Sequence, residues 1–123
     1  MNVLAIGAHP DDLEILCGGT LAKYARAGHK VTMLTIANGD MGSTTLAPPQ
    51  IAEIRLREAQ ASAAIIGARF VCLGIGDVKV MADLETRAKL TAEIRRARPD
   101  VILAHAPNDY MHDHCNASTL ALD

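Results

Sequence analysis

Short aliphatic runs alternate along the chain with segments in which apolar residues recur at helical spacing. Four runs have the length and composition of buried strands, over residues 2–8, 30–37, 69–73 and 100–104. Three segments between them predict helices, over residues 15–27, 50–66 and 84–97. A last apolar stretch near the end of the chain is also typical of a helix.

This alternation predicts the fold class. Strand–helix–strand units join neighbouring strands in parallel, and right-handed crossovers place helices on both faces of the sheet. We therefore predict an α/β fold with a Rossmann-like open parallel sheet, in one domain over residues 1–123. An incomplete sheet edge would favour association of the chain into a homo-oligomer.

Composition narrows the classes of function. Half of the residues are apolar, aromatic residues make up only 2%, and the net charge is −2. Neither a basic stripe nor an aromatic platform is present, so we expect no nucleic-acid partner. No apolar run approaches the ~20 residues of a membrane span. Without a signal peptide or a C-x-x-C pair among the 3 cysteines, the expected location is cytoplasmic.

Chemically active side chains follow three of the predicted strands. His9, Asp11 and Asp12 come directly after the first strand, an Asn-Gly-Asp loop follows the second, and a His-rich segment, residues 109–114, follows the fourth. Ligands of an open parallel sheet bind at the carboxyl ends of its strands, so these segments are expected to converge.

The residue types in these segments favour a metal site. Two histidines and a carboxylate are a common zinc set that leaves a position for water, although iron(II) uses the same ligands. Adjacent Asp11 and Asp12 would point in different directions, so one could bind the metal while the other faces a water molecule. Helix capping is the alternative for either aspartate, but it leaves His9 unexplained.

A nucleotide-binding α/β module is a second interpretation of the same fold. Such a module carries a Gly-rich loop after the first strand, where backbone N–H groups face a phosphate. The loop after residue 8 has no G-x-G-x-x-G pattern and offers two carboxylates, which would repel a phosphate.

Several short motifs follow one another along the chain: AHPDD at residues 8–12 with GGT at 18–20, NGDMG at 38–42, RLREA at 55–59 with IGA at 66–68, and DYMHDH at 109–114. In this order they resemble the motifs of the PIG-L/LmbE-like family of zinc-dependent de-N-acetylases. The resemblance covers nearly the whole chain. It implies a Rossmann-like hydrolase that removes an acetyl group from an N-acetylated amine, such as an N-acetylglucosamine conjugate.

The resemblance also implies roles for individual residues. The expected metal ligands, listed by position, are His9, Asp12 and His114, and the expected cofactor is Zn²⁺. Asp11 would be the general base that takes a proton from water, and Arg55 would contact the substrate. Asp113 would lie beside His114 and orient it.

Two departures from the family pattern are visible. Met111 stands where the family has a histidine that stabilises the oxyanion, and His112, one residue later, is the candidate substitute. Family members are also longer, so the chain is interpreted as the amino-terminal part of an LmbE-like catalytic domain. A metal-binding but inactive or truncated domain is therefore an alternative function. His105 is interpreted as structural, and Gly18 and Gly19 as positions that permit close packing of the helix on a strand.

Overall fold

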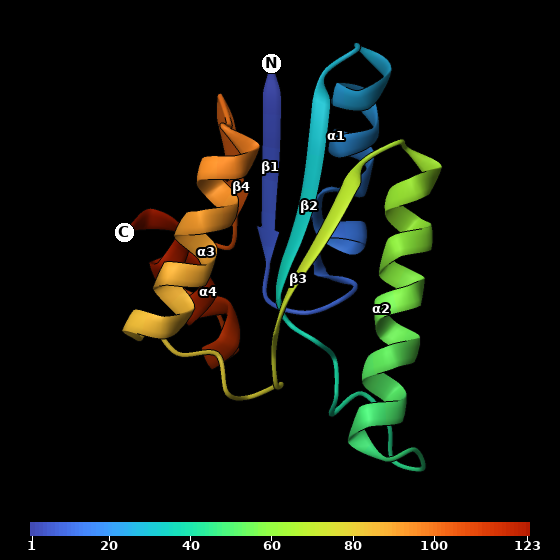
Figure 1. Cartoon of the computed structure of the whole chain (residues 1–123), viewed down its shortest axis with the longest axis vertical. Coiled ribbons are helices and arrows are strands. Elements are labelled where there is room, and N and C mark those ends of the chain that lie inside the picture. The colour runs from blue at the N-terminus through green and yellow to red at the C-terminus, as the bar shows by residue number, and fades with distance from the viewer.

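The computed structural model describes residues 1–123, in which strands and helices alternate along the chain (Figure 1). The strands are β1 (Asn2–Gly7), β2 (Lys30–Ala37), β3 (Arg69–Ile75) and β4 (Val101–Ala104). The helices are α1 (Asp12–Arg26), α2 (Pro48–Ile65), α3 (Leu84–Ala97) and α4 (His112–Leu122).

The four strands form one parallel sheet in the order β3-β2-β1-β4. Val3 of β1 pairs with Val31 on one side and with Val101 on the other. The chain first builds outward from β1 through β2 to β3, and then returns to the opposite side of β1. The strand order therefore reverses between β1 and β4, which is where ligands bind in open α/β sheets.

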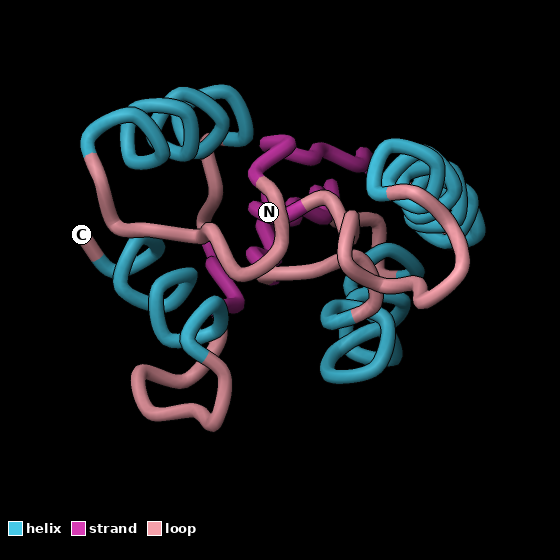
Figure 2. The backbone as a smooth tube through the Cα atoms, turned by 90° about the horizontal axis from the view of Figure 1, so that it is seen from below, coloured by secondary structure: helices cyan, strands magenta, loops and turns pink.

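Helices cover both faces of the sheet, two on each side (Figure 2), which confirms the predicted fold class. Alternate residues of β1 belong to different cores. Leu4 and Ile6 pack in the cluster that includes Leu90 of α3 and Leu120 of α4. Val3 and Ala5 pack in the second cluster, against residues of α1 and α2. Burial of a large aliphatic side chain contributes about 1.5–3 kcal/mol, so both layers stabilise the central strand.

Two helices in the structure begin at other residues than the sequence predicted. The first helix begins at Asp12 instead of residue 15, which places this carboxylate in its first turn. The second begins at Pro48, since proline is well tolerated at the first helical position. The prediction for Gly18 and Gly19 was wrong, because no strand lies within 4 Å of a Cβ built at either position. None of the helices combines the length and hydrophobicity that crossing a bilayer requires.

Candidate metal centre and catalytic pocket

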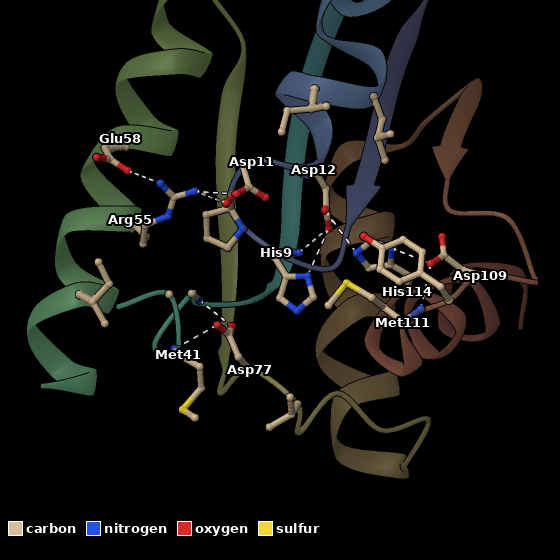
Figure 3. A pocket seen from close by; sticks show the side chains of 18 residues that line it. His9, Asp11, Asp12, Met41, Arg55, Glu58, Asp77, Asp109, Met111 and His114 are labelled. Atoms are coloured by element: carbon tan, nitrogen blue, oxygen red, sulfur yellow. Dashed lines mark hydrogen bonds and ion pairs between the residues drawn. The ribbon is translucent and has the colours of Figure 1, made fainter. Parts of the chain in front are cut away.

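A cavity of about 720 Å³ opens at the carboxyl ends of the strands (Figure 3). Its walls come from the loops that follow β1, β2 and β3, from α1 and α2, and from α4 with the segment before it. The lining includes most of the residues that the sequence indicated, namely His9, Asp11, Asp12, Arg55 and His114. Its volume falls in the range of small-molecule sites in proteins, roughly 300–1,000 Å³.

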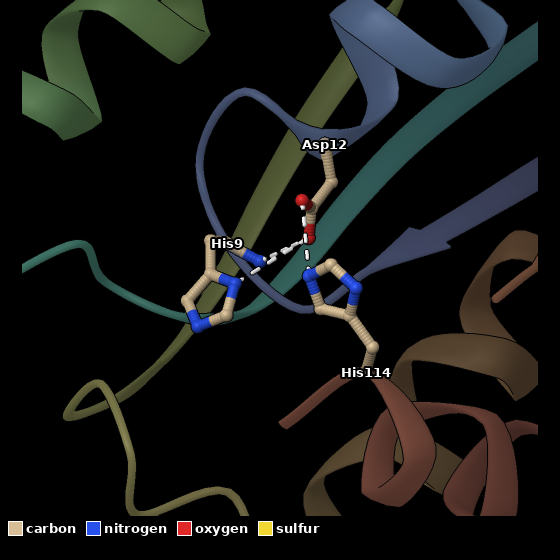
Figure 4. Close-up of side chains that lie close together, drawn as sticks. All are labelled: His9, Asp12 and His114. Carbon is tan, nitrogen blue, oxygen red and sulfur yellow. Dashed lines mark hydrogen bonds and ion pairs between the residues drawn. The ribbon is translucent and has the colours of Figure 1, made fainter. Parts of the chain in front are cut away.

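His9, Asp12 and His114 lie together on one side of this cavity (Figure 4). One ligand atom from each residue lies within 4.8 Å of the others. His9 Nδ1 is 3.6 Å from Asp12 Oδ2, and His114 Nε2 is 3.3 Å from Asp12 Oδ1. The fold thus brings together the three residues that were predicted as metal ligands from opposite ends of the chain.

The bonding state of His114 tests whether these residues fit a metal ion. Its side chain is only 7% exposed, yet its Nε2 atom makes no hydrogen bond within the protein. Buried polar atoms are seldom left without a partner, and each such atom costs about 1–3 kcal/mol. Together with the facing His9 and Asp12, the Nε2 atom fits a divalent cation of the zinc type.

Two further carboxylates contact the ring nitrogens of His9 and His114 that do not face Asp12. Asp113 Oδ2 lies 2.8 Å from His9 Nε2, and Asp109 Oδ1 lies 3.2 Å from His114 Nδ1. Carboxylates in such positions orient a ligand histidine and fix which of its nitrogens faces a metal. Each contact engages the nitrogen that points away from Asp12, so His9 Nδ1 and His114 Nε2 are left for the metal.

The expected partner of Asp113 was wrong. Asp113 contacts His9 and not the adjacent His114. Asp113 and His114 are successive residues of α4, and successive side chains of a helix point about 100° apart. The same geometry affects His112, which is exposed and does not line the cavity. Its position gives no support to a role in oxyanion stabilisation, whereas Met111 does line the cavity.

The carboxylates perturb the charge states of the site. Burial disfavours the charged imidazole of His9, but hydrogen bonds to Asp12 and Asp113 outweigh it and raise the pKa of His9 to about 9. Burial likewise opposes ionisation of Asp12, yet hydrogen bonds from His105 and His9 hold the pKa of its carboxyl well below the usual range. The site is therefore prepared to carry positive charge close to Asp12.

Asp11 differs from Asp12 in exposure and in partners. Its side chain is 52% exposed, and its backbone adopts φ 121°, a region that costs a non-glycine residue about 1–3 kcal/mol. This backbone turn separates the two carboxylates. Burial raises the pKa of Asp11, and the nearby Arg55 guanidinium opposes the rise. The side chain makes no capping hydrogen bond to α1, so capping does not explain Asp11.

Arg55 reaches the loop after β1 from α2. Its Nη2 atom donates to Asp11 Oδ2 at 3.0 Å and also to the carbonyl oxygen of Pro10, and Nη1 pairs with Glu58. The side chain is three-quarters buried and lines the cavity. Arg55 therefore holds the candidate base in place, and contact with a substrate stays a prediction.

The loop after β3 supplies a residue that the sequence analysis did not identify. The Asp77 carboxylate accepts the backbone N–H groups of Gly39 at 2.9 Å and of Met41 at 3.1 Å. The next residue, Val78, has φ 58° and donates its N–H to Asp113 Oδ2 at 2.8 Å. Asp77 stands at the end of a strand, as His9 does, and this position is the signal that would have identified it.

His105 is the second residue that the sequence analysis underrated. It directly follows β4, and its Nε2 atom lies 3.1 Å from Asp12 Oδ2. His105 also forms a second possible metal-binding group with Asp109 and His114, whose ligand atoms lie within 4.8 Å of one another. In the sequence, His105 follows a predicted strand just as His9 does, and this position indicated a place at the same edge of the sheet.

Comparisons with known proteins agree with this geometry. The family model PIG-L, described as GlcNAc-PI de-N-acetylase, matches residues 4–123. Diacetylchitobiose deacetylase of Thermococcus kodakarensis is 33% identical over 99% of this chain, and 4-oxalmesaconate hydratase of Pseudomonas putida is 30% identical over 98%. The structure of N,N'-diacetylchitobiose deacetylase from Pyrococcus horikoshii superposes with a TM-score of 0.91 at 32% identity over 98% of this chain.

The matched region is only a part of each relative. The chain covers 48% of the Thermococcus deacetylase, 50% of the Pseudomonas hydratase and 47% of the Pyrococcus structure. Relatives with two different activities thus share this half of their fold. Since the family model spans nearly the whole chain, the chain belongs to the PIG-L family of de-N-acetylases.

Proposed function

We propose that the protein is a metal-dependent amide hydrolase that removes an acetyl group from an N-acetylated amine of the sugar type, such as an N-acetylglucosamine conjugate. The observation that carries this proposal is the His114 imidazole, buried beside Asp12 and His9 with its Nε2 atom making no hydrogen bond within the protein. An amide carbonyl and an attacking water are the groups that such a site activates.

Zinc is the metal that we propose for this site. Two imidazoles and one carboxylate match a common catalytic zinc set, although iron(II) takes the same ligands. When bound, the metal would lower the pKa of water and polarise the substrate carbonyl. His9 Nδ1, Asp12 Oδ1 and His114 Nε2 would hold it, with Asp113 and Asp109 orienting the two rings.

Asp11 is the proposed general base. It lines the same cavity as the three ligands, but it is not held within their cluster. A raised pKa makes its carboxylate a better proton acceptor than an ordinary aspartate, because base strength rises with pKa. Arg55 holds one carboxylate oxygen, and the other oxygen is left to take the proton.

Sugar-type substrates are favoured by the relatives that act on acetylated sugars, as the name diacetylchitobiose deacetylase states. The cavity is lined by charged side chains as well as apolar ones and has room for a small molecule. A hydratase is the second candidate, because a relative at 30% identity bears that name and Met111 removes one donor expected for an amide oxyanion. In that reaction the activated water would add to a carbon–carbon double bond.

One experiment separates these candidates. The purified protein is loaded with zinc and incubated with N,N'-diacetylchitobiose, and released acetate is measured beside the same protein stripped with a chelator. In parallel, an unsaturated dicarboxylate is followed by the loss of its ultraviolet absorbance. Acetate release that requires zinc supports the deacetylase. Absorbance loss without acetate supports the hydratase, and neither activity in a zinc-loaded protein supports the inactive domain.

A further inference from the structure

His105 lies against two of the three proposed metal ligands. Its side chain is 4% exposed, so it belongs to the interior of the site and not to its solvent-facing rim. Its Nε2 atom is 3.1 Å from Asp12 Oδ2. Its ring stacks on the ring of His114, with centroids 4.0 Å apart and an interplanar angle of 16°.

The two oxygens of Asp12 have different surroundings. Oδ2 accepts the backbone N–H of His9 at 2.7 Å and faces His105 Nε2. Oδ1 lies 3.3 Å from His114 Nε2 and makes no other contact within the ligand group. A carboxylate with one oxygen held by two donors presents its other oxygen to a metal ion in a fixed direction.

The proton on His105 Nε2 is determined by its neighbours. The backbone N–H of Ala8 also points at Nε2, at 3.1 Å, so a donor and an acceptor face the same atom. Asp12 is ionised and buried, and a lone pair facing its oxygen would be repelled. A charge-assisted N–H···O⁻ bond is also about twice as strong as a neutral one. The buried, ionised Asp12 therefore favours the tautomer in which Nε2 carries hydrogen and donates it to Asp12, in place of the contact with the Ala8 N–H.

We propose that His105 is a positioning residue for the metal centre. Its Nε2–H holds Asp12 Oδ2 so that Oδ1 faces the ion, and its ring supports the imidazole of His114. This inference rests on the proposed metal site. The competing role is that of a ligand, in a group with Asp109 and His114. Binding an ion through Nε2 would require His105 to release Asp12, which already occupies that atom.

Two substitutions separate the hydrogen bond from the ring. His105→Gln places an amide N–H near the position of Nε2 but removes the aromatic ring, whereas His105→Phe keeps a ring and removes the donor. His29→Gln is the matched control, because His29 lies at the opposite end of the sheet beside the chain terminus. Zinc affinity is measured by competition with a chromogenic chelator, and the melting temperature of each metal-free protein verifies folding.

We expect His105→Phe to bind zinc about 10–100-fold more weakly than the wild type, the usual effect of removing a partner behind a ligand. His105→Gln should retain affinity to within about threefold, since it restores the donor. A purely structural residue would instead lower the melting temperature of the metal-free protein and leave the zinc affinity of the folded fraction unchanged. If His105→Phe does not fold, His105→Asn removes the donor from the Nε2 position with a smaller side chain.

Three outcomes would overturn the inference in different ways. Wild-type affinity in both folded variants would show that His105 does not position Asp12. Complete loss of zinc from both variants would show that His105 is itself a ligand. Absence of zinc from the wild-type protein under metal-replete conditions would reject the metal site of the proposed function, and the inference with it.

Discussion

Metal uptake by this protein should compete with a proton on His9. Carboxylates raise the pKa of His9 to about 9 in the metal-free site, so its ring is protonated at neutral pH. A metal can bind only the neutral ring. The proton that has to leave is on Nδ1, because Nε2 faces Asp113 at 2.8 Å. Zinc binding near pH 7 should therefore release about one proton from this residue.

The size of the effect follows from the same pKa. At pH values below the His9 pKa of about 9, each further decrease of one pH unit lowers the apparent zinc affinity about tenfold. The zinc affinity at pH 7 should therefore be ~10²-fold below its value above pH 9. The stability of the metal-free fold should change in the opposite direction and decrease as the pH rises. A raised pKa stabilises the fold below the unfolded value of 6.5, and this contribution, at most ~3 kcal/mol, is lost as pH rises from 6.5 to about 9.

Calorimetry in two buffers with different ionisation enthalpies counts the released proton, and chelator competition between pH 6.5 and 9 gives the affinity. Thermal unfolding of the metal-free protein over the same range measures the opposing trend. Asp113→Asn is the informative variant, because it removes one carboxylate that stabilises the charged ring and should flatten both curves. Zinc affinity that does not change between pH 7 and 9 would refute the reasoning.

Three further substitutions test other parts of the site. Asp11→Asn should keep stoichiometric zinc, measured by elemental analysis, and lose at least ~10²-fold in hydrolysis rate, and full activity would exclude it as the base. His114→Ala should bind no zinc in the same analysis, whereas retained metal would reject its role as a ligand. Gly39→Ala should cost about 1–2 kcal/mol in chemical denaturation and also reduce activity, because Gly39 has φ +78° and its added Cβ would lie 3.0 Å from Arg55 Cγ. Gly28→Ala is the control for backbone strain alone, since Gly28 has φ +84° with no atom within 4 Å, and equal losses of activity would contradict the role assigned to Arg55.

The sequence predicted the parts of the site that depend on strand ends. His9 and Asp12 follow β1 directly, and parallel strands place their carboxyl ends at one edge of a sheet. That rule brings His114 to the same edge, although 105 positions separate it from His9 in the sequence. The order of strands and helices was likewise predicted from hydrophobic periodicity, with element ends displaced by a few residues.

Pairings between individual side chains could not be predicted in this way. Whether Asp113 faces His9 or His114 depends on where α4 begins and how it is rotated, and neither appears in a periodicity pattern. Asp77 is similar, because its partners are backbone N–H groups in another loop, which any residue type provides. His105 carried a usable signal at the end of β4, but its contact with Asp12 required the helix to start three residues earlier than predicted.

The wide sequence separation between the ligands has a consequence for how the chain folds. His9 and His114 are 105 positions apart, and the ion would join the loop after β1 to α4. A bound metal would thus act as a cross-link that closes a long loop, and cross-links over long loops remove the most entropy from the unfolded state. Removal of the ion would therefore lower the stability of the fold as well as abolish the proposed activity, because α4 and the loop after β1 would lose their shared link.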